Sequence, residues 1–115
     1  MSTQTIQTVE EIVDSKVLEK GPLEYTLPCS ESKILDFLIV FKEYDYSISD
    51  ISKNSGVGFK TTLGIIRKLE SQGMILKERN VGRAQMYKLN TVSDQAKCIS
   101  KLALDIATER ALKQK

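Results

Sequence analysis

The sequence predicts a mainly α-helical domain with a small β-hairpin, an α+β fold, and three observations lead to this class. Apolar residues recur at helical spacing in several long segments. Two short stretches, residues 74–79 and 84–89, alternate apolar and polar residues around a loop that contains Gly82, which is typical of a hairpin. The chain of 115 residues is long enough for one hydrophobic core but not for two.

The centre of the chain predicts one compact unit. Ser49 is the expected N-cap of a short helix, and residues 54–56, with the sequence Asn-Ser-Gly, supply the left-handed backbone of a tight turn. A second helical run covers residues 59–72 and stops at Gly73, directly before the hairpin. Helix, turn, helix and hairpin in this order predict a winged helix-turn-helix over residues 30–90.

An accessory region is expected in front of this unit, at residues 1–29. Residues 8–20 predict a first helix, which starts with a capping-box pattern at Thr8 and ends before Pro22. Residues 23–28 are expected to form an extended connector.

The segment 33–42 predicts a buried helix, with Ser30 or Ser32 as its N-cap. Its residues 34–41 are apolar nearly all round, which is the pattern of a helix that packs inside a core. A strand is the alternative, since Ile and Val favour sheets, but the length between the caps favours a helix.

The run 59–72 has two different faces. Thr62, Ile66 and Leu69 form a stripe that would seat the helix on the core. The opposite face carries small, hydrogen-bonding and cationic side chains, namely Lys60, Gly64, Arg67 and Ser71, with Thr61 and Lys68 beside them. This composition fits a helix in the major groove of DNA, because Arg can bond guanine, Thr can bond a base edge and Lys can neutralise phosphate. The alternative is a charged face that is merely solvated.

The predicted hairpin would present cations on its outer surface. The candidates for its inner face are Ile75, Tyr87 and Leu89, and Lys77 and Arg79 are expected to alternate along the outer face of the first strand. At or near the tip, Arg79, Asn80 and Arg83 would reach phosphates or a minor groove.

Charge is distributed unevenly along the chain. The formal net charge is +2, but residues 53–88 carry eight Lys/Arg and two Asp/Glu, whereas residues 1–52 carry four Lys/Arg and ten Asp/Glu. A basic segment of this kind favours contact with a polyanion. The candidate DNA-binding residues are Ser49, Lys53, Lys60, Thr61, Gly64, Arg67, Lys68, Lys77, Arg79, Asn80 and Arg83.

The sequence contains no recognisable catalytic or metal-binding pattern. It has no histidine, and Cys29 and Cys98 are far apart, so neither a zinc site nor the commonest general base is expected. A Gly-rich phosphate loop is also missing, and we expect neither enzyme activity nor a cofactor. The cysteines are expected to be reduced and partly buried, with a disulfide as the alternative in a hyperthermophile.

Membrane association is not indicated by the sequence. The longest apolar run, residues 37–41, is far shorter than the roughly 20 residues that span a bilayer. The N-terminus lacks the basic region and apolar core of a secretory signal. We therefore expect a cytoplasmic, nucleoid-associated protein.

The C-terminal segment, residues 91–115, predicts a dimerisation helix with Thr91 and Ser93 as caps. Its apolar residues recur at spacings of four and three, as in a coiled-coil seam. Together with two residues of the N-terminal helix, the expected dimer interface comprises Val9, Val13, Val92, Ala96, Ile99, Ala103 and Ile106. The alternative is that the C-terminal helix packs on the core of its own chain.

In these motifs the chain resembles the winged helix-turn-helix transcription regulators of the MarR and ArsR kinds and their small archaeal relatives. The motifs that carry the resemblance are Ser49-Asp50-Ile51, Ser55-Gly56-Val57, the helix that ends in Leu69-Glu70, Gly73-Met74-Ile75 and Gly82-Arg83. The resemblance implies a homodimer on a pseudo-palindromic operator. It also implies DNA contacts from Lys60, Thr61, Arg67 and Lys68, and wing contacts from Arg79 and Arg83.

Two departures from the family pattern stand out. Leu63 and Gly64 occupy positions where such proteins often carry polar base readers, and the paired Cys or His residues of metal sensors are missing. Leu63 and Ile65 are expected in the core or at an interface.

The function expected from the sequence is that of a sequence-specific, double-stranded DNA-binding transcriptional regulator, a repressor, that acts as a homodimer. Residues 59–72 would lie in the major groove and residues 79–83 on the backbone or in the minor groove. The alternatives are a winged-helix protein-interaction module and a weakly specific chromosome-coating protein. No residue pattern marks a small-molecule effector.

Overall fold

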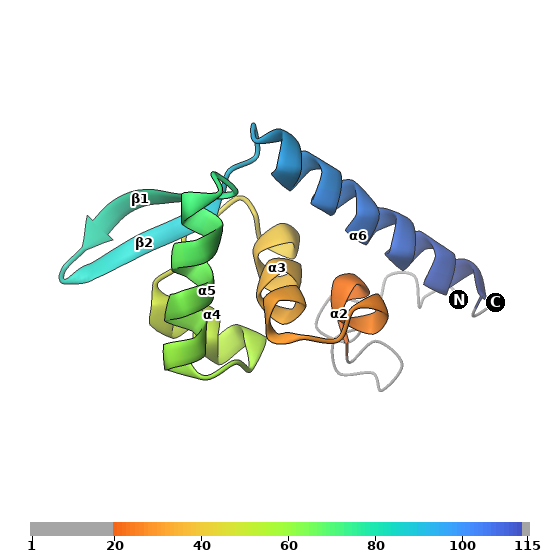
Figure 1. Ribbon diagram of the computed structural model, residues 1–115, viewed down its shortest axis with the longest axis horizontal. Helices are drawn as coiled ribbons and strands as arrows, with labels where there is room; N and C mark the ends of the chain where they lie inside the picture. Colours follow the sequence, from red (N-terminus) through yellow and green to blue (C-terminus); the bar gives the residue numbers. More distant parts are fainter. Residues whose placement is uncertain (1–19, 114–115) are drawn as a thin grey trace, which may run out of the picture.

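The computed structural model describes residues 20–113 as packed helices with a two-stranded hairpin at one side (Figure 1). The elements follow in the order α2 (Pro22–Thr26), α3 (Ser30–Val40), α4 (Ile48–Ser55), α5 (Phe59–Ser71), β1 (Ile75–Val81), β2 (Ala84–Leu89) and α6 (Asp94–Lys113). This confirms the predicted mainly helical class with one antiparallel hairpin. The helix predicted at residues 8–20, with Val9 and Val13, lies outside the described residues apart from Lys20.

A short helix, α2, replaces the extended connector predicted at residues 23–28. Pro22 occupies its first position, where a missing N–H leaves no hydrogen bond unmade. The N-cap residue is a glycine, so the cap comes from α3 instead: Leu23 and Glu24 donate their N–H groups to the carboxylate of Asp36 at 2.9 and 3.0 Å. The prediction of a connector was wrong because this capping carboxylate is distant in the sequence.

The Asp36 carboxylate lies in the interior, with only 7% of the residue exposed. Burial raises the pKa of this carboxyl, although the two backbone N–H donors act in the opposite direction. Gly21 is so close that a Cβ atom there would collide with the Asp36 side chain. The junction between α2 and α3 therefore depends on both residues.

α3 is a helix, as predicted, but its N-terminus is different. It begins at Ser30 and is capped by Cys29, whose N–H donates to the hydroxyl of Ser32 at 3.2 Å. The middle of the helix is buried in the core. Its C-terminal end is not, since Val40 is 54% exposed, so this helix is not enclosed on all sides.

α4 is capped by Ser47 and not, as predicted, by Ser49. The Ser47 hydroxyl accepts the N–H of Asp50 at 3.1 Å, and the Asp50 carboxylate accepts the N–H of Ser47 at 3.4 Å. This reciprocal pair is a capping box, and it places Ser49 in the first turn with its side chain exposed. Ile51 is fully buried, as predicted.

Only glycine provides left-handed backbone in the turn after α4. Gly56 has φ 76°, whereas no other residue type within 20–113 has a positive φ. Asn54 and Ser55, which were expected to share this role, still belong to the helix. The Asn54 side chain donates to the carbonyl of Asp50 at 2.8 Å.

α5 packs on the core through the predicted stripe. Thr62 and Ile66 are fully buried, and Leu69 is nearly so. The hydroxyl of Thr62 donates to the carbonyl of Val57 at 3.2 Å, which satisfies a buried polar group that would otherwise be costly. Ile65 is buried as well, as expected for a core residue.

β1 and β2 pair from Ile75 and Leu89 at the base of the hairpin to Val81 and Ala84 at its end. Gly82 has φ 63° in the two-residue turn, which fits the type II′ turn that suits the twist of a hairpin. The predicted inner face is confirmed, because Ile75, Tyr87 and Leu89 are all buried.

The first strand does not alternate regularly along its outer face as predicted. Glu78 is the extra residue of a β-bulge between Lys77 and Arg79, and a bulge bends and twists a strand locally. A third segment pairs with the hairpin from the other side. Tyr46 and Tyr87 exchange two backbone hydrogen bonds of 2.7 and 2.8 Å. The loop before α4 is therefore tied to β2.

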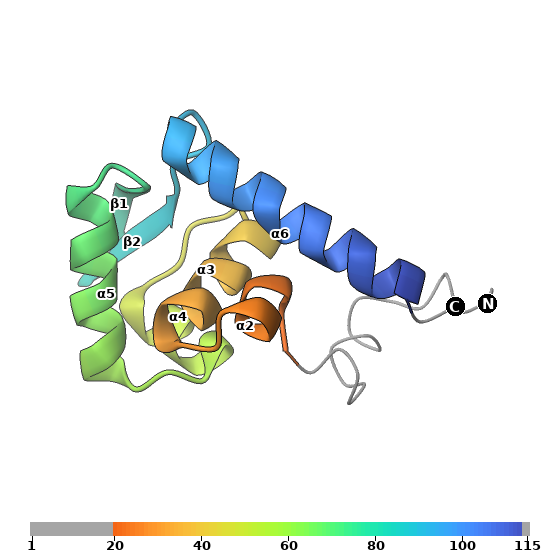
Figure 2. The same ribbon diagram turned by 45° about the vertical axis from the view of Figure 1, so that its right-hand side comes forward.

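α6 crosses α2 and α3 as one long helix (Figure 2). Of the two predicted caps, Thr91 and Ser93, it is Ser93 whose hydroxyl accepts the N–H of Ala96 at 3.2 Å, and the helix begins at Asp94. The stripe expected at a dimer interface packs on the core of its own chain: Ala96 and Ala103 are buried, and Ile99 and Ile106 are partly buried against the core. The helix thus packs on the core of its own chain, which was the alternative to the predicted dimer seam, because α2 and α3 present an apolar surface to it. The remaining predicted member, Val92, is exposed and precedes the helix.

The two cysteines differ from the expectation of partial burial. Cys29 and Cys98 are both exposed and both free. Between residues 20 and 113, no group of three metal-binding side chains comes together. Over the same span, no helix is both long and apolar enough to cross a membrane.

Candidate nucleic-acid interface

The outer face of α5 carries five of the eleven candidate DNA-binding residues. Lys60, Thr61, Gly64, Arg67 and Lys68 are all exposed, opposite the stripe that packs on the core. Apart from the chain neighbours and the backbone of α5 itself, no heavy atom lies within 4 Å of the point where a Cβ would stand on Gly64. A base edge could therefore approach the backbone closely at the middle of this face.

The cations of α5 differ in how they are engaged. Lys68 donates to Glu31 of α3 at 3.1 Å, and this bond lowers the pKa of the Glu31 carboxyl. Both side chains are exposed, so water screens the pair and a phosphate can compete for the lysine. Lys60 and Arg67 form no ion pair with any other residue of the described part of the chain.

The cations of α4 and the hairpin surround this face. Lys53 lies exposed in the last turn of α4. Lys77 of β1 approaches Glu70 of α5, with 3.9 Å between nitrogen and oxygen, which links the hairpin to one flank of the helix. Asn80 and Arg83 are exposed at the end of the hairpin, and Arg83 lies in the turn itself.

Arg79 is placed differently from the other hairpin cations. It pairs with Met86, so two further residue pairs separate it from the turn. Its guanidinium donates to both carboxylate oxygens of Asp45, from Nε at 2.7 Å and from Nη2 at 3.1 Å. This bidentate pair lowers the pKa of Asp45 and raises that of Arg79. Arg79 therefore contacts the loop before α4 in this structure.

Known structures resemble this arrangement of helices and hairpin. BldR, a transcriptional regulator from Sulfolobus solfataricus, aligns over 97% of this chain and 80% of its own with a TM-score of 0.57 and 14% identity. A ZitR variant of Lactococcus lactis in complex with DNA aligns over 97% of this chain and 76% of its own, with a TM-score of 0.57 and 15% identity. Another ZitR variant is covered over only 56% of its length.

A third similar structure is the homodimeric winged helix-turn-helix DNA-binding domain of Mb0332 from Mycobacterium bovis, described as a possible ArsR-family transcriptional regulator. It covers 100% of this chain and 94% of its own, with a TM-score of 0.53 and 16% identity. No protein-family model and no curated protein matches the sequence. This chain has the winged helix-turn-helix fold. At identities this low, the similarity establishes the fold alone.

In this winged helix, α4 and α5 form the helix-turn-helix, α5 occupies the place of the recognition helix, and the β1–β2 hairpin is the wing. All eleven candidate DNA-binding residues lie on α4, on α5 or on the wing, and all eleven are exposed. Three of the six candidate cations on α5 and the wing form ion pairs with carboxylates, namely Lys68, Lys77 and Arg79.

Two residues outside the set of candidates also lie at this surface. Asp45 holds Arg79, and its loop gave no periodic signal in the sequence. Phe59, the first residue of the recognition helix, is 53% exposed. With Ile48 and Ala84 it lines a hollow of about 280 Å³ between the helix-turn-helix and the wing. The exposure of Phe59 could have been predicted from the sequence, because this residue lies outside the apolar stripe that packs on the core.

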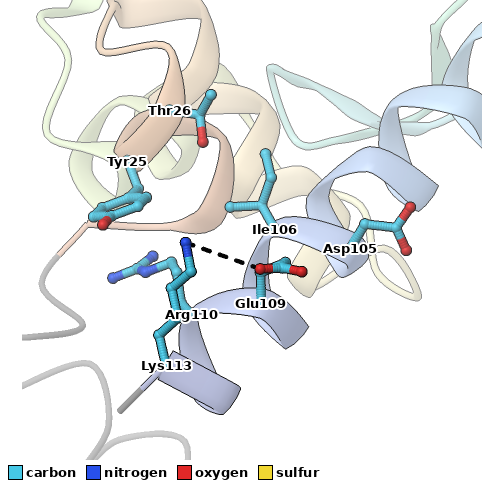
Figure 3. Close-up of a pocket in the computed structure, with 7 residues that line it drawn as sticks. All are labelled: Tyr25, Thr26, Asp105, Ile106, Glu109, Arg110 and Lys113. Atoms are coloured by element: carbon cyan, nitrogen blue, oxygen red, sulfur yellow. Dashed lines mark ion pairs between the residues drawn. The ribbon is translucent and has the colours of Figure 1, made fainter.

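A second hollow, also of about 280 Å³, lies at the far end of the molecule between α2 and α6 (Figure 3). Arg110 donates to the carbonyl of Lys20 at 3.1 Å and lies 4.1 Å from the centre of the Tyr25 ring. A cation over an aromatic ring is a favourable contact. These contacts fasten the C-terminal end of α6 to α2, so this region supports the fold at a distance from the recognition helix.

Proposed function

We propose that this chain is a sequence-specific, double-stranded DNA-binding transcriptional regulator that acts as a homodimer. α5 would lie in the major groove, and residues 79–83 of the wing would contact the backbone or the minor groove. One observation carries the proposal. Lys60 and Arg67, both exposed and without an ion-pair partner in residues 20–113, lie on the same face as Gly64, whose backbone is open to approach.

Each side chain on this face has a distinct proposed role. Arg67 can bond both acceptors of a guanine edge, while Thr61 can bond a base edge or contact a thymine methyl group. Lys53 and Lys60 are suited to phosphates, which position a protein on the duplex without reading its sequence. Arg83 in the turn of the wing would reach the neighbouring backbone or minor groove.

The solved structures support the same class of function. The ZitR variant was solved in complex with DNA, and BldR is named a transcriptional regulator. Of the two apolar residues of α5 whose exposure would have favoured a protein-interaction module, Ile65 is buried and Leu63 is partly buried. A repressor, which blocks polymerase by occupying its site, is the simplest form of the proposed regulator.

The proposed homodimer needs a surface other than the buried stripe of α6. Leu104 is 65% exposed and forms one wall of a largely apolar groove, with Ile39 and Val40 of α3 on the other side. The groove measures about 360 Å³ and lies away from the recognition helix. A second copy seated there would present two recognition helices, and operators of this type space their half-sites by about 34 Å. The Mb0332 domain, which is homodimeric, supports this part of the proposal.

Replacement of Arg67 tests the proposed docking face. Arg67→Ala should weaken binding to a preferred duplex by about 1–3 kcal/mol and relax the preference at one base pair. Lys113→Ala is the matched control, because it also removes one exposed cation, at the C-terminal end of α6 and on the side away from the wing. Fluorescence anisotropy with a labelled duplex measures both. Equal affinities of the two variants would contradict the assignment of α5 as the recognition helix.

A further inference from the structure

One short segment, residues 45–46, attaches the wing to the rest of the molecule in addition to the Lys77–Glu70 pair and the buried side chains at the base of the hairpin. Tyr46 exchanges two backbone hydrogen bonds with Tyr87 of β2, and Asp45 accepts two hydrogen bonds from Arg79 of β1. The segment thus contacts both strands of the hairpin. The Asp45 side chain is only 13% exposed and lies beside the middle of the hairpin, where Arg79 pairs with Met86.

The same segment is fixed to the helix-turn-helix. The ring of Tyr46 packs on that of Phe37 in α3, with 4.7 Å between the ring centroids. Ser47, the next residue, is the N-cap of α4 and forms the capping box with Asp50. The backbone next to Asp45 is therefore anchored to the helical core, while the carboxylate of Asp45 binds Arg79 of the wing.

The position of Arg79 in the strand explains why it needs a partner. It directly follows the bulge at Glu78, where the ladder between β1 and β2 is locally interrupted. Beyond this point the hairpin consists of only three residue pairs, and a short two-stranded ribbon is marginal in water without support. A bidentate Arg–carboxylate pair supplies both attachment and a fixed geometry there.

We propose that Asp45 is a positioning residue, which sets the orientation of the wing through Arg79 so that Arg83 meets the DNA. This inference rests on the proposed function and refines it, because it makes Arg79 a brace of the wing and leaves the direct contact to Arg83. A role for Arg79 as a phosphate contact predicts the opposite effect of removing the carboxylate.

Asp45→Asn distinguishes a positioning role of Asp45 from a phosphate-binding role of Arg79, because the two roles predict opposite changes in DNA affinity. Asp45→Asn removes a negative charge from the neighbourhood of DNA, which by simple electrostatics should strengthen binding and would also free Arg79 for a phosphate. If Asp45 positions the wing, the same substitution weakens binding, by about 3-fold or more. The matched control is Glu43→Gln, because Glu43 is an exposed acid of the same loop with no ion pair in the described part of the chain.

Exchange of the two charged groups provides the second part of the test. Arg79→Asp alone should bind DNA weakly, and the double variant Asp45→Arg with Arg79→Asp should recover most of the lost affinity. A general loss of structure would not be rescued in this way. Asp45→Arg alone is the control for the added positive charge, because electrostatics alone predict tighter binding for it and loss of the brace predicts weaker binding. Circular dichroism during thermal unfolding establishes that each variant is folded.

The rates of amide hydrogen exchange in residues 76–86, measured without DNA, show how firmly the Asp45–Arg79 pair holds the hairpin. Asp45→Asn should raise their exchange rates above those of Glu43→Gln, and the double variant should return them toward the wild type. Faster exchange without any DNA binding by the wild type would support the brace and contradict the proposed function. Unchanged exchange, or DNA binding by Asp45→Asn as tight as that of the wild type, would overturn the positioning role.

Discussion

Gly64 is the residue at which stability and the proposed function make opposite demands. It lies in the interior of α5, where glycine is less favourable than alanine by about 0.5–1 kcal/mol. Apart from its chain neighbours and the backbone of its own helix, a Cβ there would meet no atom of the protein within 4 Å. Its place in the chain is therefore not explained by packing, but a closely approaching base edge would explain it.

Gly64→Ala should accordingly stabilise the protein by about 0.5–1 kcal/mol and weaken its binding to DNA. Urea unfolding and duplex titration on the same preparation measure the two effects. Gly21→Ala is the contrasting control, since its Cβ would collide with Asp36, and it should destabilise the fold by about 1–3 kcal/mol. A Gly64→Ala variant that is more stable and binds DNA at least as tightly would show that the helix backbone does not approach the bases.

Side chains that face the core could be predicted residue by residue, whereas those engaged by distant partners could not. The spacing of Thr62, Ile66 and Leu69 identified the buried stripe of α5 because helical periodicity is local. The carboxylate of Asp45 gave no such signal. Its partner, Arg79, is 34 positions away, and only the folded chain brings the two together.

At the scale of elements, capping explains which boundaries were predicted and which were not. The N-terminus of α6 was predicted to within two residues, because Ser93, one of the two predicted caps, forms a cap hydrogen bond that spans only three residues. α2 was missed because its cap is the side chain of Asp36, from another helix. The beginning of α4 was placed two residues late, since Ser47 and Ser49 are both good caps in sequence and only Ser47 completes the pair with Asp50.

The assignment of the α4 cap leads to a paired prediction. Ser47→Ala should reduce the free energy of unfolding by about 1 kcal/mol, because it leaves the N–H of Asp50 without its acceptor. Ser49→Ala, on the exposed side of the first turn, should change that free energy by less than about 0.5 kcal/mol. Urea denaturation of both variants provides the comparison. A larger loss for Ser49→Ala would mean that the helix starts where the sequence alone had suggested.

The apolar stripe of α6 shows a different limit of sequence reasoning. Its four-and-three spacing correctly indicated a helix with one apolar face, but periodicity cannot tell whether that face meets a second copy or the core of its own chain. Ala96 and Ala103 are buried within the chain, and their small side chains let α6 lie close to the core. The surface still exposed for a partner is carried by other residues, with Leu104 and Leu112 among them.

At the scale of the whole molecule, the uneven distribution of charge follows the fold. The basic segment, residues 53–88, spans the end of α4, the recognition helix and the wing, and the excess of acids lies in residues 1–52. The net charge of +2 therefore conceals a basic segment, which forms the side of the molecule that carries α5 and the wing. Binding to DNA through this side should weaken steeply as salt is added, because counterions released from phosphates contribute to the affinity.

The most direct test of sequence-specific recognition through α5 is an in vitro selection from random duplex DNA at about 150 mM salt, repeated with Arg67→Ala. We predict an enriched palindromic motif with half-sites about one helical turn apart, and a blurred motif at one position of each half-site for the variant. Binding without an enriched motif would contradict sequence-specific recognition and indicate a chromosome-coating protein. The absence of any bound DNA would contradict the proposed nucleic-acid interface itself.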